Sequence, residues 1–138
     1  MIEITNAFDA YSVLKEHMTS DVEEVWVLAL NSSLRLIEIK MIFRGTVDSC
    51  LIHPRDVFRF ACMTNASQIV VAHNHPSGDL SPSNEDIKIT KQLIIASRMI
   101  EIPILDHLIL TSTHYCSMAH QGFISSPRHP KQKGLRDF

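Results

Sequence analysis

Two histidines and one aspartate lie close together in the stretch VVAHNHPSGDLSPSNEDIKIT, which runs from Val70 to Thr90. His73 and His75 end an apolar run, and Asp86 follows eleven residues after the second histidine. Side chains on a strand point to the same face at every second residue, so both imidazoles can face one point. Asp86 would reach that point from the first turn of the next helix. Two nitrogens and one carboxylate oxygen, with a fourth position left for water, are typical of a catalytic zinc site.

The same three residues also fit simpler or different roles. Asp86 follows Ser83 by three residues, which is the spacing of a capping box at a helix start. Ser81 followed by Pro82 is a rival helix start, because proline suits the first helical position. Two histidines and a carboxylate are also the ligands of non-haem iron enzymes, which keep open positions for oxygen and a cosubstrate. The residue types alone therefore leave a zinc site, an iron site and a simple helix cap open.

The elements that must position these residues follow from the apolar pattern. Helical spacing and continuous or alternating apolar runs predict the order helix, strand, strand, helix, strand, helix, strand, strand. The expected ranges are 6–18, 25–30, 34–43, 54–65, 67–73, 83–100, 103–112, and a short strand with a helical turn within 114–124.

Local signals mark several ends of these elements. Asn6 can cap the first helix, Pro54 can open the second, and Asn65 can end it. The sequence NSS at 31–33 predicts a hairpin turn. The alternation in the following strand slips near Leu36, which predicts a bulge there.

The size and composition of the chain are those of one ordinary domain. It has 138 residues, of which 45% are hydrophobic and 20% are charged. Strands and helices mixed in one short chain favour an α/β fold, with a single-domain mixed β-sheet flanked by helices. We expect this domain to span residues 1–125, followed by a polar, basic tail at 126–138 that has no fixed structure.

Charge is distributed unevenly along the chain. Residues 1–127 hold nine Lys/Arg and fourteen Asp/Glu, a formal −5, whereas the last eleven residues hold a formal +3. Because phosphate binding relies on Lys and Arg, the body of the domain gives little support to nucleic-acid binding. Only the tail, with its four basic residues, could contact phosphates or an acidic partner.

The three cysteines and the termini suggest a compartment. Cys50, Cys62 and Cys116 are odd in number and form no C-x-x-C pair, which predicts small buried thiols in a reduced, intracellular protein. The N-terminus has no pattern of charged then apolar residues typical of a signal peptide. No apolar run approaches the ~18 residues that span a bilayer. We therefore expect a cytoplasmic protein with no membrane association.

The stretch HNHPSGDLSPSNED resembles the pattern His-x-His-Pro, six residues, Ser-x-x-Asp of the JAB/MPN metalloprotease domain, known as the JAMM motif. More narrowly, GTVDSCLIHPRDVF, NASQIVVAHNHPSGD, PSNEDIKITKQL and IPILDHLIL are similar to stretches of its RadC-like branch. The likeness runs from about Glu23 to Gly122. It implies a JAB/MPN fold, which is a sandwich like that of cytidine deaminase.

The resemblance also implies roles for single residues. His73, His75 and Asp86 would hold Zn²⁺. Ser83 would donate a hydrogen bond to the developing oxyanion or to the activated water. A glutamate at the edge of the first core strand would be the general base, which the RadC-like pattern places at Glu23, with the neighbouring Glu24 in reserve. Without the motif, this acidic pair would be interpreted as solvated residues at a strand entrance.

The implied function is that of a zinc-dependent hydrolase, most simply a metallopeptidase or isopeptidase whose substrate is a peptide or isopeptide. The alternative is a DNA-repair-associated or DNA-binding accessory protein of the RadC type without peptidase activity. A catalytically silent scaffold is a further alternative, which the intact ligand set disfavours. Asp106 and His107, in a predicted buried strand, could orient a ligand histidine or form a satisfied polar pair in the core.

Overall fold

The computed structural model describes residues 1–18, 21–45 and 52–125. Within these residues the elements follow the predicted order. They are α1 (Ala7–Leu14), β1 (Glu24–Leu30), β2 (Leu36–Arg44), α2 (Pro54–Met63), β3 (Gln68–Asn74), α3 (Asn84–Ile100), β4 (Ile104–Leu110) and β5 (Tyr115–Ser117). The predicted tail at 126–138 and Cys50 lie outside the described residues.

One mixed sheet forms the centre of the fold, as the sequence predicts. Its strand order is β2-β1-β3-β4-β5. β3 and β4 are parallel, while the other neighbouring pairs are antiparallel. All residues of β3 and β4 are buried, which explains why their sequences are continuous apolar runs rather than alternating ones.

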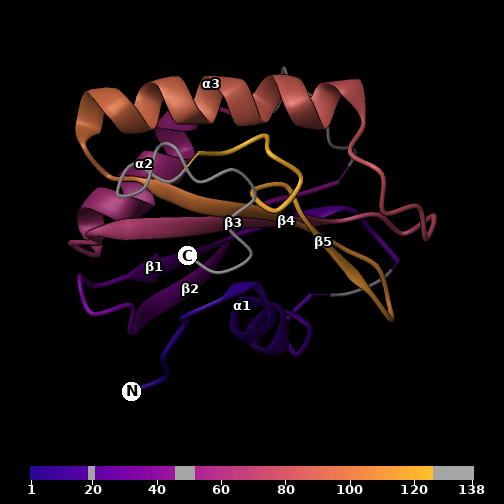
Figure 1. Ribbon diagram of the computed structural model, residues 1–138, viewed down its shortest axis with the longest axis horizontal. Coiled ribbons are helices and arrows are strands. Elements are labelled where there is room, and N and C mark those ends of the chain that lie inside the picture. The colour runs from indigo at the N-terminus through magenta and orange to yellow at the C-terminus, as the bar shows by residue number, and fades with distance from the viewer. Residues whose placement is uncertain (19–20, 46–51, 126–138) are drawn as a thin grey trace.

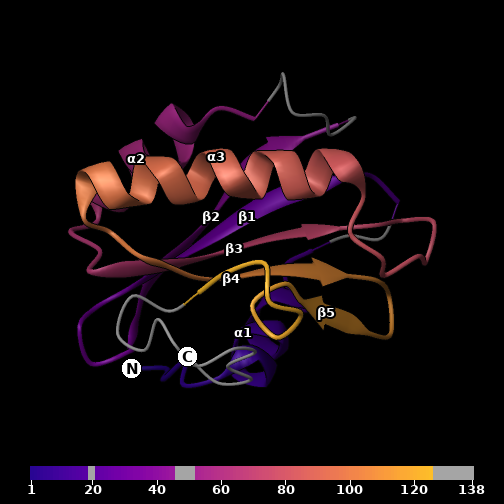
Figure 2. The ribbon, with the colours of Figure 1, turned by 45° about the horizontal axis from the view of Figure 1, so that its top comes forward.

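Helices cover both faces of this sheet. Figures 1 and 2 show α2 and α3 on one face and α1 on the other. Two buried apolar clusters match these two layers. The cluster on the α2 and α3 side includes Val71, Phe58 and Leu93, and the cluster on the α1 side includes Leu14 and Leu28. The sheet is therefore a platform held from both sides, and the candidate residues lie at one end of it.

Local signals in the sequence set most of the element ends correctly. The Asn6 side chain caps α1 by accepting from the Asp9 backbone N–H at 2.8 Å. Pro54 opens α2, and Asn65 follows it in the left-handed conformation at φ 53°. The register between β1 and β2 shifts opposite Leu36, which confirms the predicted irregularity.

Among the predicted ranges that were too long, the first helix and the second strand show the physical reason. The α1 helix ends at Leu14 rather than at Met18, because the chain there closes into a tight turn. The turn after β1 extends beyond Ser33: the Asn31 carboxamide accepts from the backbone N–H groups of Ser33 and Arg35. As a result β2 starts two residues later than predicted.

The prediction that the cysteines are buried holds for Cys116 and is wrong for Cys62. Cys62 is near the end of α2 and its side chain is exposed. The buried face of this helix instead includes Phe60, which lies with Val57 and Ala61 against the sheet. The helical spacing of the apolar residues in α2 did not determine which of them face the core.

In the part of the chain that the structure describes, no helix combines the length and the apolar character needed to cross a membrane.

Asp106 fixes the segment after β5 to the sheet. Its buried carboxylate accepts from the Ser117 hydroxyl and from the backbone N–H groups of His107 and Ala119. Ser117 in turn caps the following turn by accepting from the His120 N–H at 3.0 Å. Asp106 is thus a structural acceptor in β4 that ties the segment after β5 to the sheet.

We expect Asp106→Ala to lower the free energy of unfolding by about 3 kcal/mol, because three buried donors would lose their acceptor. Chemical denaturation followed by circular dichroism measures this change. Asp21→Ala is the matched control at an exposed position and should change stability by no more than about 0.5 kcal/mol. Equal effects of the two substitutions would contradict the structural role of Asp106.

Candidate metal centre

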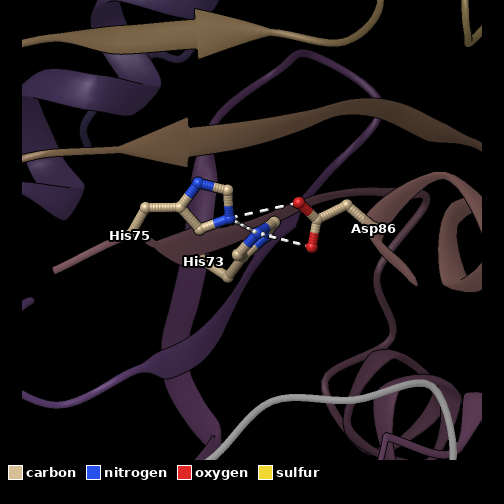
Figure 3. A group of neighbouring side chains, drawn as sticks. All are labelled: His73, His75 and Asp86. Atoms are coloured by element: carbon tan, nitrogen blue, oxygen red, sulfur yellow. Dashed lines mark hydrogen bonds and ion pairs between the residues drawn. The ribbon is translucent and has the colours of Figure 1, made fainter. Parts of the chain in front are cut away.

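His73, His75 and Asp86 come together where β3 ends and α3 begins. His73 lies in β3 and is buried, and His75 follows the strand directly. The backbone N–H of His75 donates to the Leu110 carbonyl at 2.8 Å, so pairing with β4 continues one residue past β3 and holds His75 in extended register. Asp86 stands in the first turn of α3 and is buried. Figure 3 shows the three side chains converging on one point.

The distances within this cluster suit a small cation. The Nε2 atoms of His73 and His75 are 3.0 Å apart. The Asp86 carboxylate lies 3.0 Å from the first of these nitrogens through Oδ1 and 3.1 Å from the second through Oδ2. Ligands about 2.0 Å from a tetrahedral zinc ion are about 3.3 Å from one another, close to these separations. The three residues therefore form a cluster that could hold a metal ion.

The carboxylate and the imidazoles change each other's proton affinity. Burial alone would raise the pKa of Asp86, but hydrogen bonds with His73 and His75 outweigh it and hold that pKa well below its usual range. The hydrogen bond with Asp86 raises the pKa of His75 above 6.5, against the opposing effect of burial. Asp86 is thus an ionised acceptor that attracts a positive charge to this point.

Ser83, and not Ser81, is the cap of α3. The Ser83 hydroxyl accepts from the Asp86 N–H at 3.1 Å, and the Ser83 N–H donates to Asp86 Oδ2 at 2.8 Å. This is the complete capping box that the spacing predicts. Asp86 therefore serves the helix start and the cluster together, so a role in capping and a role as a ligand are compatible.

Glu23 and Glu24 have different surroundings, although they are neighbours in sequence. Glu23 lines the same cavity as the two histidines and Asp86, and its charge contributes to the raised pKa of His75. Glu24 is buried, accepts from the Trp26 indole N–H at 3.2 Å and lies 3.5 Å from the Arg44 guanidinium. Of the two, Glu23 is the one whose side chain borders the candidate centre.

Two open cavities adjoin each other at this end of the sheet. The one over the cluster has a volume of about 310 Å³ and is also lined by Ser83. A larger one of about 780 Å³ extends along β5 and the start of α1. Ser81 and Pro82 line both cavities. A molecule in the larger space could therefore reach the cluster past this short loop.

Asp106 and His107 are both buried and satisfied in the core, and the Asp106 carboxylate accepts from the His107 backbone N–H, but their side chains otherwise have different partners. Asp106 serves the segment after β5, whereas the Nε2 atom of His107 lies 2.7 Å from the Nδ1 atom of His73. Sequence reasoning missed Thr90, whose hydroxyl lies 2.6 Å from the Nδ1 of His107. Its spacing of four residues from Asp86 places both on one face of α3, which was the available signal.

Comparison with known sequences places this arrangement in a family. The sequence model described as the RadC-like JAB domain matches residues 4–123. A UPF0758 protein from Staphylococcus haemolyticus is 38% identical over 123 residues, which are 88% of this chain and 54% of that protein. Another from Staphylococcus carnosus is 42% identical over 123 residues, again 88% of this chain and 54% of that protein.

A UPF0758 protein from Thermosynechococcus vestitus is 46% identical over 101 residues, which are 73% of this chain and 40% of that protein. The chain thus spans about half the length of these relatives. The match at 4–123 begins before Glu23 and so includes α1 in addition to the stretches that carry the sequence motifs. With a matching sequence over most of its length, a five-stranded mixed sheet and the histidine–aspartate cluster at the sheet's end, the chain belongs to the RadC-like JAB domain family.

Proposed function

We propose that this protein is a zinc-dependent hydrolase, most simply a metallopeptidase or isopeptidase. The observation that carries the proposal is the convergence of two imidazole nitrogens and a carboxylate, all about 3 Å apart, beside a glutamate in an open cavity. The buried platform of β3 and the capped start of α3 hold these groups in place. A site of this kind is fixed by rigid elements, as hydrolysis requires.

His73, His75 and Asp86 are the proposed zinc ligands. Two nitrogens and one oxygen suit zinc and leave a position open for chemistry. When bound there, zinc would polarise a carbonyl group and acidify a water molecule. The low pKa of Asp86 keeps a negative charge at the site. This charge favours binding of a divalent cation between the two histidines and the carboxylate.

Glu23 is the proposed general base. From the wall of the cavity it would accept a proton from the attacking water and then pass that proton to the leaving amine. Ser83 is the proposed donor to the oxyanion. Its hydroxyl oxygen accepts from the Asp86 N–H, so its own proton is left to donate into the cavity that it lines.

The proposed substrate is a peptide or isopeptide amide. The cavity of about 780 Å³ next to the cluster leaves room for several residues of a polypeptide. Amide hydrolysis uses a base, an oxyanion donor and a cation around one carbonyl, and the residues described above supply such a set. The iron oxygenase alternative gives no role to Glu23 or Ser83. The nucleic-acid alternative rests on the basic tail, which lies outside the described residues.

The metal prediction concerns His75. Purified protein supplemented with zinc should contain about one zinc ion per chain by elemental analysis. His75→Ala should reduce zinc affinity by more than the ~10–100-fold typical of losing a group that only supports a ligand. His114→Ala, at an exposed histidine outside the cluster, should bind zinc like the wild type. A wild-type protein without zinc after supplementation would overturn the proposal.

Zinc binding should also depend on pH. Because Asp86 raises the pKa of His75, protons compete with zinc for this imidazole from somewhat above pH 6.5 downwards. We expect the apparent affinity to be nearly constant at higher pH and to drop about tenfold for each pH unit below that pKa. Competition with a chromophoric chelator measures this profile. A range of about pH 5.5 to 8.5 brackets the usual histidine pKa of about 6.5. An affinity independent of pH would exclude His75 as a ligand.

Glu23→Gln separates metal binding from chemistry. This variant should retain zinc but lose at least ~100-fold in hydrolysis, the usual contribution of a general base. A pooled library of internally quenched peptides, analysed by mass spectrometry, provides the assay. The matched variant is Glu24→Gln, which removes a neighbouring carboxylate that faces Trp26 and Arg44 and should leave the cleavage rate intact. Loss of cleavage in Glu24→Gln alone would reassign the base.

A further inference from the structure

A chain of short hydrogen bonds runs from the candidate metal centre through His107 and Thr90, two buried residues that do not line the cavity over the cluster. His73 Nδ1 lies 2.7 Å from His107 Nε2. On the other side of the same ring, His107 Nδ1 lies 2.6 Å from the Thr90 hydroxyl. That hydroxyl lies 2.7 Å from the backbone carbonyl oxygen of Asp86. The chain therefore begins at one proposed ligand and ends at the backbone of another.

The last member of the chain indicates a direction for these hydrogen bonds. A carbonyl oxygen can only accept, so the one proton of the Thr90 hydroxyl is assigned to the Asp86 carbonyl at 2.7 Å, rather than to His107 Nδ1 or to the Met118 sulfur at 3.6 Å. The Thr90 oxygen then accepts, which puts the ring proton of His107 on Nδ1. A neutral His107 with a proton on Nδ1 has a bare Nε2, and this nitrogen accepts from His73 Nδ1–H. All three links run the same way.

The consequence falls on the other nitrogen of His73. In the arrangement without a cation, His73 Nε2–H donates to Asp86. Because the other ring proton is held on Nδ1, loss of the Nε2 proton leaves a neutral His73 whose Nε2 lone pair points towards His75 and Asp86. This is the nitrogen that a cation between the three residues would need. In the reverse tautomer, Nε2 would carry the proton and could not bind a metal.

We propose that His107 and Thr90 are positioning residues that select the metal-binding tautomer of His73. The inference rests on the proposed zinc site. His107 is buried, and no charged side chain is among its hydrogen-bonding partners in the described part of the chain. Both residues come from elements that frame the site, β4 and α3, so the same contacts also fix the distance between His73 and the helix start.

The substitutions Thr90→Val and Thr90→Ser test the direction of the chain. Valine has nearly the shape of threonine but cannot accept from His107 Nδ1–H. The proton of the buried ring can then move to Nε2, and His107 Nε2 no longer accepts from His73 Nδ1–H. We expect Thr90→Val to weaken zinc binding about tenfold, within the ~10–100-fold range for such partners. Thr90→Ser keeps the hydroxyl and should bind zinc within about threefold of the wild type, since the whole chain of hydrogen bonds can form.

His107→Gln and His107→Leu test the acceptor. The glutamine side-chain oxygen can occupy the place of Nε2 and accept from His73, whereas leucine leaves the His73 N–H without an acceptor. Chelator competition should therefore show a loss of about 10–100-fold for leucine and a clear recovery for glutamine. Unfolding measured in excess chelator gives the stability of each metal-free variant, which separates a folding defect from a binding defect.

Nitrogen-15 NMR of the imidazoles gives a readout that a merely structural role would not change. In zinc-loaded wild type, His73 should be the Nδ1–H tautomer with Nε2 bound to metal, and His107 should be neutral with its proton on Nδ1. A wild-type His107 with its proton on Nε2 would overturn the inference, even if every variant folds. Equal zinc affinity of Thr90→Val and Thr90→Ser would overturn it as well.

Failure of this inference can be told apart from failure of the proposed function. If the wild type binds one zinc ion and all four variants bind it equally well, the zinc site stands and the positioning role is wrong. If the wild type binds no zinc, both are wrong. If His107→Leu does not fold, the two Thr90 variants and the tautomer of wild-type His107 still decide the question.

Discussion

The carboxylate of Asp86 is the interaction on which the candidate site depends. It accepts the backbone N–H of Ser83 at the start of α3, and its two oxygens approach the two histidines at the end of β3. One side chain thus fixes a helix start relative to a strand end. A buried carboxylate is costly unless it is fully satisfied, and here hydrogen bonds and imidazoles supply that satisfaction. The same carboxylate therefore determines both the position of the start of α3 and the geometry of the cluster.

The sheet gives this carboxylate a fixed target. β3 lies in the middle of the sheet, with β1 on one side and β4 on the other, and apolar clusters pack on both faces. A strand with neighbours on both sides has little freedom to twist or slide. His73 therefore cannot move away from Asp86 without disturbing two ladders of hydrogen bonds. The rigidity that the site needs comes from ordinary packing, some of it far from the chemistry.

Much of this arrangement could be predicted from the sequence, because its signals are local. Continuous apolar runs indicate β3 and β4, and the spacing of Ser83 and Asp86 indicates the helix start. The roles of Asp106 and His107 could not be separated in this way. They are adjacent, yet one carboxylate serves the turn after β5 and one imidazole serves His73. Their main partners are distant in sequence. The register of β3 against β4 also shifts near the start of β3, so the residues that face each other across the two strands cannot be counted from the sequence.

The capping box shared with the cluster has a consequence for how an ion would arrive. The three side chains stand about 3 Å apart because Asp86 draws the imidazoles inward and the helix start holds Asp86. Little reorganisation energy therefore separates this arrangement from one that encloses a cation. A cation could then bind or leave with only small movements of these side chains and with release or uptake of protons. The site would be organised before the ion arrives and would not need to close around it.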